Sequence, residues 1–347
     1  MTSPTSPEIA YTAARTTMAW ADLIGYGWLR VSGRDRLDFL QRLSTNDFRK
    51  LAPGAGLPTV LATATGRMIA LLIACATEDA VYMRTPPGRA GVLAAHFNSL
   101  IFWNDELEVS DLSAETVQIG LFGPGAAGWL ADAACVALDD LQPNAWRGGS
   151  IGGTAVMIQR CGALEAPDWI IIAAAEHGDE LRTILTAAAP ALNEVQVEAI
   201  RVEKGIPAWG SELSDQVTPL EAGLRDAISD NKGCYTGQEV IARQLNYDKV
   251  TRRMVGLLLP ADAPIADLKG ATIAAGGRGG FVGTAVWSPA LDRPIALAFV
   301  PRDVAEPGAQ VTIRKSHGEI VAAVTDLPFV GRESQQINKS AKGRIGT

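Results

Sequence analysis

The chain has 347 residues, of which 47% are hydrophobic and 20% are charged, and its formal net charge is −7. This composition is typical of a folded protein, and it excludes a largely disordered chain or a filament. The length favours two or three domains. The acidic balance argues against broad, phosphate-driven binding of nucleic acid.

Two features that the sequence lacks indicate where in the cell the protein acts. No apolar run approaches the ~20 residues that are needed to cross a bilayer. The first twenty residues contain no basic segment followed by an apolar one, so no secretory or transit signal is evident. We therefore expect a cytoplasmic protein without a membrane partner.

The cysteines argue against a metal centre. Cys75, Cys135, Cys161 and Cys234 lie far apart, and together with three histidines they form no metal-ligand spacing. We expect no metal site built from this chain alone. The first three cysteines lie in apolar or alanine-rich stretches and are predicted to fill the core, whereas Cys234 has different neighbours.

The first two thirds of the chain mix strand and helix patterns. Residues 27–33 predict a strand, and the helical spacing of Leu37, Leu40 and Leu43 predicts a helix that ends in a Gly/Pro-rich loop. Residues 59–76 predict two strands around a turn at Gly66. Further strands are predicted within 80–86, 117–122, 155–161 and 168–175, and helices within 88–102, 126–134 and 178–192.

These elements interleave without a regular βαβ repeat, and no dinucleotide-binding fingerprint follows a strand, so the pattern favours an α+β fold. No internal repeat is visible in the sequence. Beyond about residue 250 the pattern changes to short strands separated by Gly and Pro turns, which indicates a small β-barrel or sandwich. The strands lie within 271–276, 280–288, 294–300 and 309–315. The polar tail is predicted to be flexible.

The stretch NKGCYTGQEVIARQL, residues 231–245, places Cys234 between two glycines and just before a predicted helix. The partial positive charge of the helix start, and the Lys232 ammonium if it folds back, would both favour a thiolate. Glu239 would act in the opposite direction. The alternative is a small cysteine that merely fits a tight, buried turn.

Two carboxylates precede this stretch. Glu203 lies two residues after Arg201, and Glu221 lies four residues before Arg225. A carboxylate can accept two parallel hydrogen bonds from the adjacent N–H groups of a flat heterocycle. Ordinary ion pairing, such as Glu203 with Arg201 or Lys204, is the alternative.

Taken together, these stretches resemble the glycine cleavage T-protein (aminomethyltransferase) superfamily, and within it the YgfZ-type folate-binding branch. KGCYTGQE, residues 232–239, is similar to the hallmark octapeptide of that branch. The other matching segments are GRDRLDFLQRLSTNDFRKLAPGAG (33–56), GLFGPGA (120–126), RVEKGIPAWGSEL (201–213), TPLEAGL (218–224) and VGTAVWSPALDRPIALAFV (282–300).

The resemblance implies a fold of three parts around a central folate cleft, with two interleaved α+β subdomains in residues 1–249, a C-terminal β-barrel in 250–333 and a flexible tail in 334–347. It implies tetrahydrofolate or a one-carbon derivative as cofactor, with Glu203 facing the pteridine. Cys234 and Lys232 would be the catalytic residues. The remaining cofactor-binding residues would be Arg201, Glu221, Arg225, Tyr235, Gln238 and Glu239.

The implied function is support of iron–sulfur cluster assembly or repair, with iron–sulfur proteins or their assembly machinery as partners. Two departures separate the chain from true aminomethyltransferases: they resemble GGxxDD where this chain has TGRMIALL (65–72), and their catalytic aspartate should fall in the helix GRAGVLAAHF, which contains no acid here. A tetrahydrofolate-dependent aminomethyltransferase or demethylase is the first alternative. A folate-binding scaffold without chemistry is the second.

Overall fold

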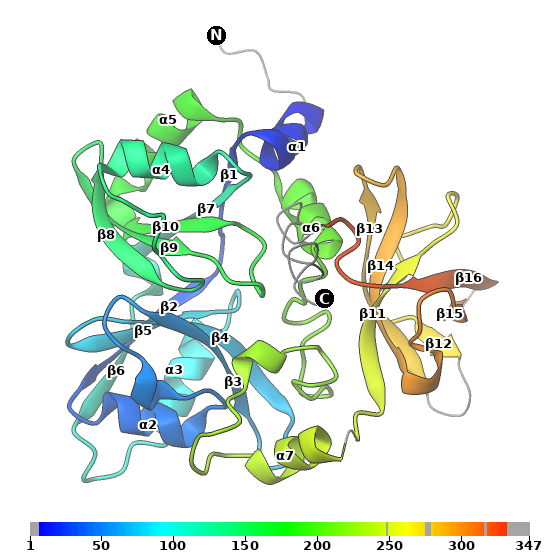
Figure 1. Cartoon of the computed structure of the whole chain (residues 1–347), viewed down its shortest axis with the longest axis horizontal. Coiled ribbons are helices and arrows are strands. Elements are labelled where there is room, and N and C mark those ends of the chain that lie inside the picture. The colour runs from blue at the N-terminus through cyan, green and yellow to red at the C-terminus, as the bar shows by residue number, and fades with distance from the viewer. Residues whose placement is uncertain (1–6, 248, 275–278, 316–317, 332–347) are drawn as a thin grey trace, which may run out of the picture. The chain divides into compact units, whose positions relative to one another are not determined.

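The computed structural model describes residues 7–247, 249–274, 279–315 and 318–331. The helices and helical turns are α1 (Pro7–Thr16), α2 (Arg36–Leu43), η1 (Phe48–Lys50), α3 (Ala90–Asn98), η2 (Ser113–Glu115), α4 (Ala126–Ala134), η3 (Ala175–His177), α5 (Gly178–Ala188), α6 (Glu194–Glu203), η4 (Arg225–Ala227), α7 (Gln238–Asn246) and η5 (Arg302–Val304). The strands are β1 (Ala19–Asp22), β2 (Gly27–Gly33), β3 (Gly56–Ala62), β4 (Met68–Ala76), β5 (Ala80–Thr85), β6 (Leu107–Asp111), β7 (Thr116–Phe122), β8 (Trp146–Ile151), β9 (Thr154–Arg160), β10 (Trp169–Ala174), β11 (Arg252–Leu258), β12 (Thr272–Ala274), β13 (Gly280–Ser288), β14 (Arg293–Pro301), β15 (Gln310–Lys315) and β16 (Gly318–Thr325). Figure 1 labels many of them along the chain.

The chain divides into two compact units. The first unit holds the described residues up to Val197 and from Ala208 to Val250, and the second holds Glu198–Pro207 together with the described residues from Thr251 onward. The division into domains 1–249 and 250–333 stays a prediction, and the predicted tail, 334–347, lies outside the described residues.

Two five-stranded sheets form the framework of the described part of the first unit. Their strand orders are β3-β4-β5-β2-β6 and β1-β7-β10-β9-β8, and every strand pair in them is antiparallel. This arrangement confirms the α+β prediction. Four strands and two helices follow the same order in each sheet, β2-α2-β3-β4-β5-α3 and β7-α4-β8-β9-β10-α5, and the fifth strand, β6 or β1, pairs with β2 or β7. The topology therefore repeats although no repeat is visible in the sequence.

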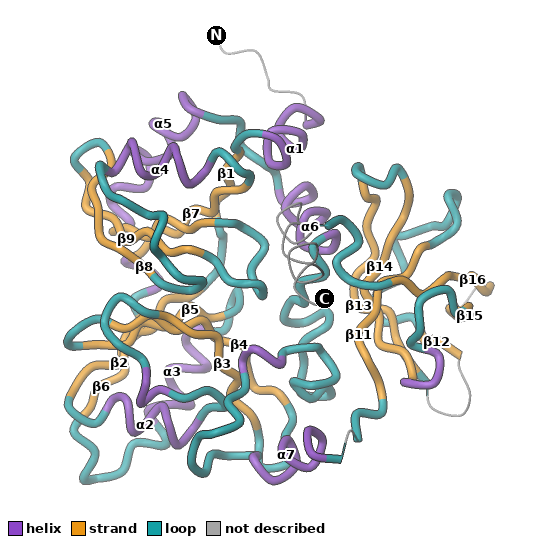
Figure 2. The backbone as a smooth tube through the Cα atoms, viewed as in Figure 1, coloured by secondary structure: helices purple, strands orange, loops and turns teal. Residues whose placement is uncertain are grey.

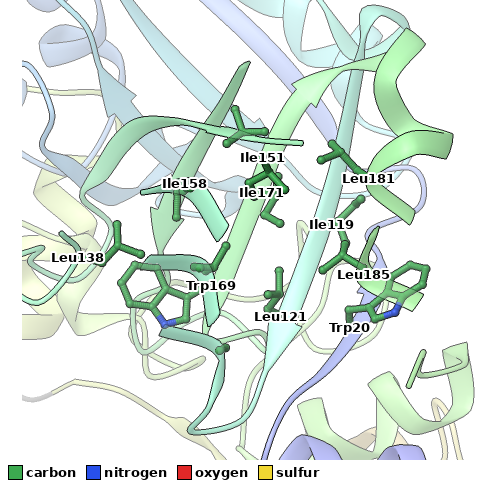
Figure 3. Close-up of a cluster of buried hydrophobic side chains, with 14 of the residues drawn as sticks. Trp20, Ile119, Leu121, Leu138, Ile151, Ile158, Trp169, Ile171, Leu181 and Leu185 are labelled. Atoms are coloured by element: carbon green, nitrogen blue, oxygen red, sulfur yellow. The ribbon is translucent and has the colours of Figure 1, made fainter. Parts of the chain in front are cut away.

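Each sheet carries its own pair of helices on one apolar face. Helices α4 and α5 pack on the second sheet, where Leu181 and Leu185 join the core formed by Ile119, Leu121 and Ile171 (Figure 3). The first sheet is covered in the same way by α2 and α3, whose buried residues include a phenylalanine each. Apolar residues at helical spacing on these helices, facing β-branched and leucine residues on the strands, explain why burial selects this layering.

The apolar periodicity predicted most of these elements, and the structure confirms the strand at 27–33, the helix within 36–43 and the two strands around Gly66. One cysteine assignment is wrong. Cys75 and Cys161 are buried as expected, but Cys135 is exposed. It lies at the C-terminal cap of α4 with φ +52, where the chain leaves the helix in the left-handed conformation.

The second unit contains a closed antiparallel barrel whose described strands run in the order β11-β14-β13-β12-β15-β16. This confirms the predicted barrel. The sequence pattern had located four of these strands, β12 to β15, and missed β11 and β16. Val202 of α6 packs against Ile295 and Leu297 of β14, so the last part of α6 belongs to the apolar surface of the barrel.

Candidate functional site

The segment that leads to Cys234 is almost entirely loop, as Figure 2 shows for the chain between α6 and α7. It is fastened to the loop that follows α2. Thr45 is central to this contact, because its Oγ1 donates to the carbonyl oxygen of Ala227 at 2.6 Å and its own carbonyl accepts from the Ser229 amide at 3.0 Å. Asn46 adds a bond from Nδ2 to the Asp226 carbonyl at 3.2 Å. The path of residues 226–229 is therefore fixed by the side chains of Thr45 and Asn46 and by the Thr45 carbonyl, which belong to a distant segment.

Lys232 continues this attachment with a buried ammonium group. Its Nζ donates to the carbonyl oxygens of Gln41 at 2.8 Å, Ser44 at 2.5 Å and Asn46 at 2.7 Å. These carbonyls lie at and just beyond the C-terminus of α2, where a cation is favourable. The ammonium is thus held by α2 and the loop after it, rather than folded back onto the thiol of the nearby Cys234.

The same burial changes the acidity of Lys232. Loss of water lowers the pKa of its ammonium to about 8; the Asp47 carboxylate opposes this shift and the Arg49 guanidinium adds to it. The ring of Tyr235 lies 5.0 Å from the Nζ atom and completes the enclosure. Burial also raises the pKa of the Tyr235 phenol to about 12, with Asp230 adding to the shift and Arg225 opposing it.

The start of α7 is anchored by Gly237. Its φ is +83, and a Cβ at this position would lie 2.5 Å from the carbonyl oxygen of Thr63 in the turn between β3 and β4. Gln238 closes the preceding turn, because its Oε1 accepts from the Tyr235 amide at 3.3 Å while its own amide donates to the Tyr235 carbonyl. A glycine is required here both for the backbone conformation and for the close approach.

Cys234 lies between these anchors and is exposed. It is therefore not the small buried side chain of the alternative interpretation. The described residues form no hydrogen bond with its Sγ atom. The cysteine is presented to solvent by a loop whose flanking residues, Lys232 and Gly237, are buried.

Glu221 is buried and belongs to a reciprocal turn with Thr218. Its Oε2 accepts from the Thr218 amide at 2.9 Å and from Thr218 Oγ1 at 3.2 Å, while its own amide donates to Thr218 Oγ1 at 3.4 Å. Arg67 lies 3.7 Å away as a cation partner. The pattern T-x-x-E is the signature of such a box, and it could have shown this structural role in the sequence.

Two other predicted residues of the first unit have local partners. Arg225 donates to the Ile228 carbonyl at 2.8 Å and pairs with the Asp230 carboxylate. Glu239 is exposed and pairs with Arg243 one turn later on α7, at 3.1 Å. The role of both in binding a cofactor stays a prediction.

Arg201 and Glu203 lie in the second unit, at the end of α6. The Arg201 guanidinium binds the Glu198 carboxylate at 2.6 Å and donates to Thr284 Oγ1 of β13 at 2.9 Å. One oxygen of Glu203 accepts from Ser288 Oγ at 2.5 Å. Both side chains are buried and hold α6 to the barrel; that Glu203 faces a pteridine stays a prediction.

Within the described residues, no three His, Cys, Asp or Glu side chains gather in a way that could hold a metal ion. A search of the same residues finds no helix with the length and apolar character needed to cross a bilayer.

Comparison with known proteins places these features in a family. The family model described as GCVT N-terminal domain matches residues 7–232, and the one described as Glycine cleavage T-protein C-terminal barrel domain matches residues 252–331. The solved structure of glycine cleavage system aminomethyltransferase T from Bartonella henselae superposes with a TM-score of 0.82 at 23% identity, covering 95% of this chain and 91% of that one.

Curated relatives agree over most of the chain. The aminomethyltransferase of Geobacillus kaustophilus is 30% identical over 332 residues, which cover 92% of this chain and 89% of the relative. The protein named putative transferase At1g60990, chloroplastic, of Arabidopsis thaliana is 30% identical over 318 residues, which cover 90% of this chain and 71% of the relative.

The two antiparallel sheets and the closed barrel are thus those of the T-protein fold. Because the N-terminal family model alone matches more than half of the chain, the protein belongs to the glycine cleavage T-protein family and is aminomethyltransferase-like.

Proposed function

We propose that the protein binds a reduced folate and uses the Cys234 thiol to support the assembly or repair of iron–sulfur enzymes, as in the YgfZ-type branch. The observation that carries the proposal is an exposed thiol on a loop with buried anchors on both sides. A cysteine that served only packing would not need such a support. Membership of the T-protein family supports the folate part, and the octapeptide at 232–239 supports the choice of branch.

The geometry favours a thiol that meets an incoming molecule. Because the Sγ atom is exposed and has no hydrogen bond to the described residues, it is open to a partner without loss of an internal contact. A thiolate in such a position can coordinate iron together with ligands from a partner, exchange with a disulfide or accept a group. Iron and sulfide would be cargo in this scheme.

The test is rescue of a deletion strain, read out as the activities of several iron–sulfur enzymes. Wild type is expected to restore them and Cys234→Ser is expected to fail. Cys135→Ser is the matched control, since Cys135 is the other exposed cysteine of the described structure, and it should rescue fully. Titration with tetrahydrofolate should give the same affinity for all three proteins. Full rescue by Cys234→Ser would remove the thiol from the mechanism.

A second candidate is a genuine tetrahydrofolate-dependent aminomethyltransferase. It is favoured by the identity of 30–31% over 92–93% of this chain to two relatives named aminomethyltransferase. Against it, α3 has the sequence AGVLAAHFN and carries no acid where the resemblance locates the catalytic aspartate. Tetrahydrofolate-dependent turnover of an aminomethyl donor by the purified protein would establish this activity, and its absence would support the first proposal.

A further inference from the structure

A cluster of cations with a single carboxylate lies beside the Cys234 loop. Arg49 and Lys50 belong to η1, directly after the loop that holds Lys232. Both share the buried carboxylate of Asp47, with Nε of Arg49 at 3.7 Å and Nζ of Lys50 at 3.6 Å. Burial alone would raise the pKa of the Asp47 carboxyl, but the Arg49 amide donor and the two cations hold it below its usual range. Three cations, Arg49, Lys50 and Lys232, therefore lie near the single Asp47 carboxylate.

The guanidinium of Arg49 reaches the residue next to Cys234. A Cβ built on Gly233 would lie 3.8 Å from its Nη2 atom. The Arg49 side chain is 59% exposed, so its remaining donors face solvent rather than protein. Nearby, Arg225 and Asp230 neutralise each other as a pair. Within the group formed by Arg49, Lys50, Lys232 and Asp47, cations therefore outnumber the anion, in a chain whose net charge is −7.

Separate segments bring these groups together, which argues against a chance encounter of mobile side chains. The bonds of Lys232 to the carbonyls of Ser44 and Asn46 lock the start of the Cys234 loop to the residues just before Arg49. Asp47 in turn accepts from the Arg49 amide at 3.3 Å and fixes the direction of η1. The backbone positions of Arg49 and Cys234 are therefore set by the same contacts.

We propose that Arg49 is a specificity-determining residue of the Cys234 site: its guanidinium, assisted by Lys50, holds an anionic group, a carboxylate or phosphate, of the molecule that meets the thiol. The inference rests on the proposed use of Cys234. A guanidinium offers two parallel donors to such a group. Because residue 233 is a glycine, no side chain at that position contacts the guanidinium.

The test compares two alkylating reagents on the full-length protein, anionic iodoacetate and neutral iodoacetamide. In both reactions the Cys234 thiol first loses its proton to solvent; the thiolate then attacks the CH₂ carbon, an S–C bond forms, and the C–I bond breaks as iodide leaves. Both rates are proportional to the fraction of Cys234 that is ionised, so this fraction cancels in the ratio of the two rates. Arg49→Gln should lower the iodoacetate/iodoacetamide ratio about threefold at low salt, as expected for one unit charge at about 7 Å in water. High salt should shrink the effect.

The controls lie within the same molecule. Peptide mass analysis also gives the ratio at Cys135, which is exposed as well and should not change. Arg49→Lys keeps the charge and should keep most of the wild-type ratio. An equal ratio at Cys234 in wild type and Arg49→Gln, or an equal fall at both cysteines, would overturn the inference. Rescue by Cys234→Ser would instead overturn the proposed function and leave the ratio untouched.

Discussion

At the scale of single residues, Lys232 is unusual because its charged side chain is buried, whereas lysine side chains are mostly exposed. Its ammonium is enclosed by three carbonyls and a tyrosine ring, and burial lowers its pKa to about 8 from the ordinary value of 10.5. Between these two pH values the unfolded chain binds more protons at this lysine than the folded chain does. Stability contributed by this residue should therefore rise with pH across that window.

We expect the unfolding free energy of wild type, relative to that of Lys232→Met, to rise by roughly 2–3 kcal/mol from pH 8 to pH 10.5, because each pKa unit corresponds to about 1.4 kcal/mol. Urea titrations at several pH values measure it. Lys50→Met, at a lysine whose side chain is 75% exposed, supplies the reference slope. If the unfolding free energies of Lys232→Met and Lys50→Met changed with pH in the same way, burial would not lower the pKa of Lys232.

The sequence predicted that Lys232 and Cys234 would lie in an unusual local setting, but not which way the ammonium turns. Its acceptors are backbone carbonyls near residues 41–46, and carbonyl groups carry no signature in a sequence. The exposure of Cys234 was equally open, because a glycine-flanked turn can face either inward or outward. The T-x-x-E box at Thr218 and Glu221 is different: its spacing could have indicated the bond between these two residues, but the family resemblance implied only a cofactor-binding role for Glu221.

At the scale of elements, Gly237 sets the contact between the start of α7 and the β3–β4 turn. Gly237→Ala should cost about 1–2 kcal/mol for the positive φ, plus the shift needed to relieve a 2.5 Å approach to the Thr63 carbonyl. Gly88→Ala is the matched control, with φ +69 and open space around the added methyl group. Thermal unfolding should show a clearly larger loss for Gly237→Ala. If the two variants lost equal stability, the positive φ alone would account for the cost of Gly237→Ala, and the close approach to Thr63 would add nothing.

The apolar pattern succeeded where an element is long enough to show it, as in α2 with its helical spacing or in β4 with its continuous run of buried residues. It failed for β1, which has four residues, and for β8, whose sequence WRGGSI contains two glycines. Such strands are defined by their partners in the sheet rather than by their own pattern. The repeated topology of the two sheets was hidden for the same reason, because strand order is set by pairing between distant residues.

At the scale of the whole chain, the second unit is assembled from two separate segments, Glu198–Pro207 and the chain from Thr251 onward. The sequence predicted the change of character near residue 250, where short strands with Gly and Pro turns begin. It held no sign that residues 198–207 belong with the barrel, because Val202 meets Ile295 and Leu297 from a distant part of the chain. Only the tertiary contacts assign the end of α6 to this unit.

Arg201 tests whether that segment stabilises the barrel without a ligand. Arg201→Met removes the donors to the Ile206 carbonyl and to Thr284 of β13, and unpaired buried acceptors cost about 1–3 kcal/mol. Hydrogen exchange without folate should therefore become faster in β13 and in residues 198–207. Arg314→Met removes a pair with Glu319 that is exposed on both sides and should change little. If both variants exchange like wild type until folate is added, Arg201 acts on the ligand and not on the barrel.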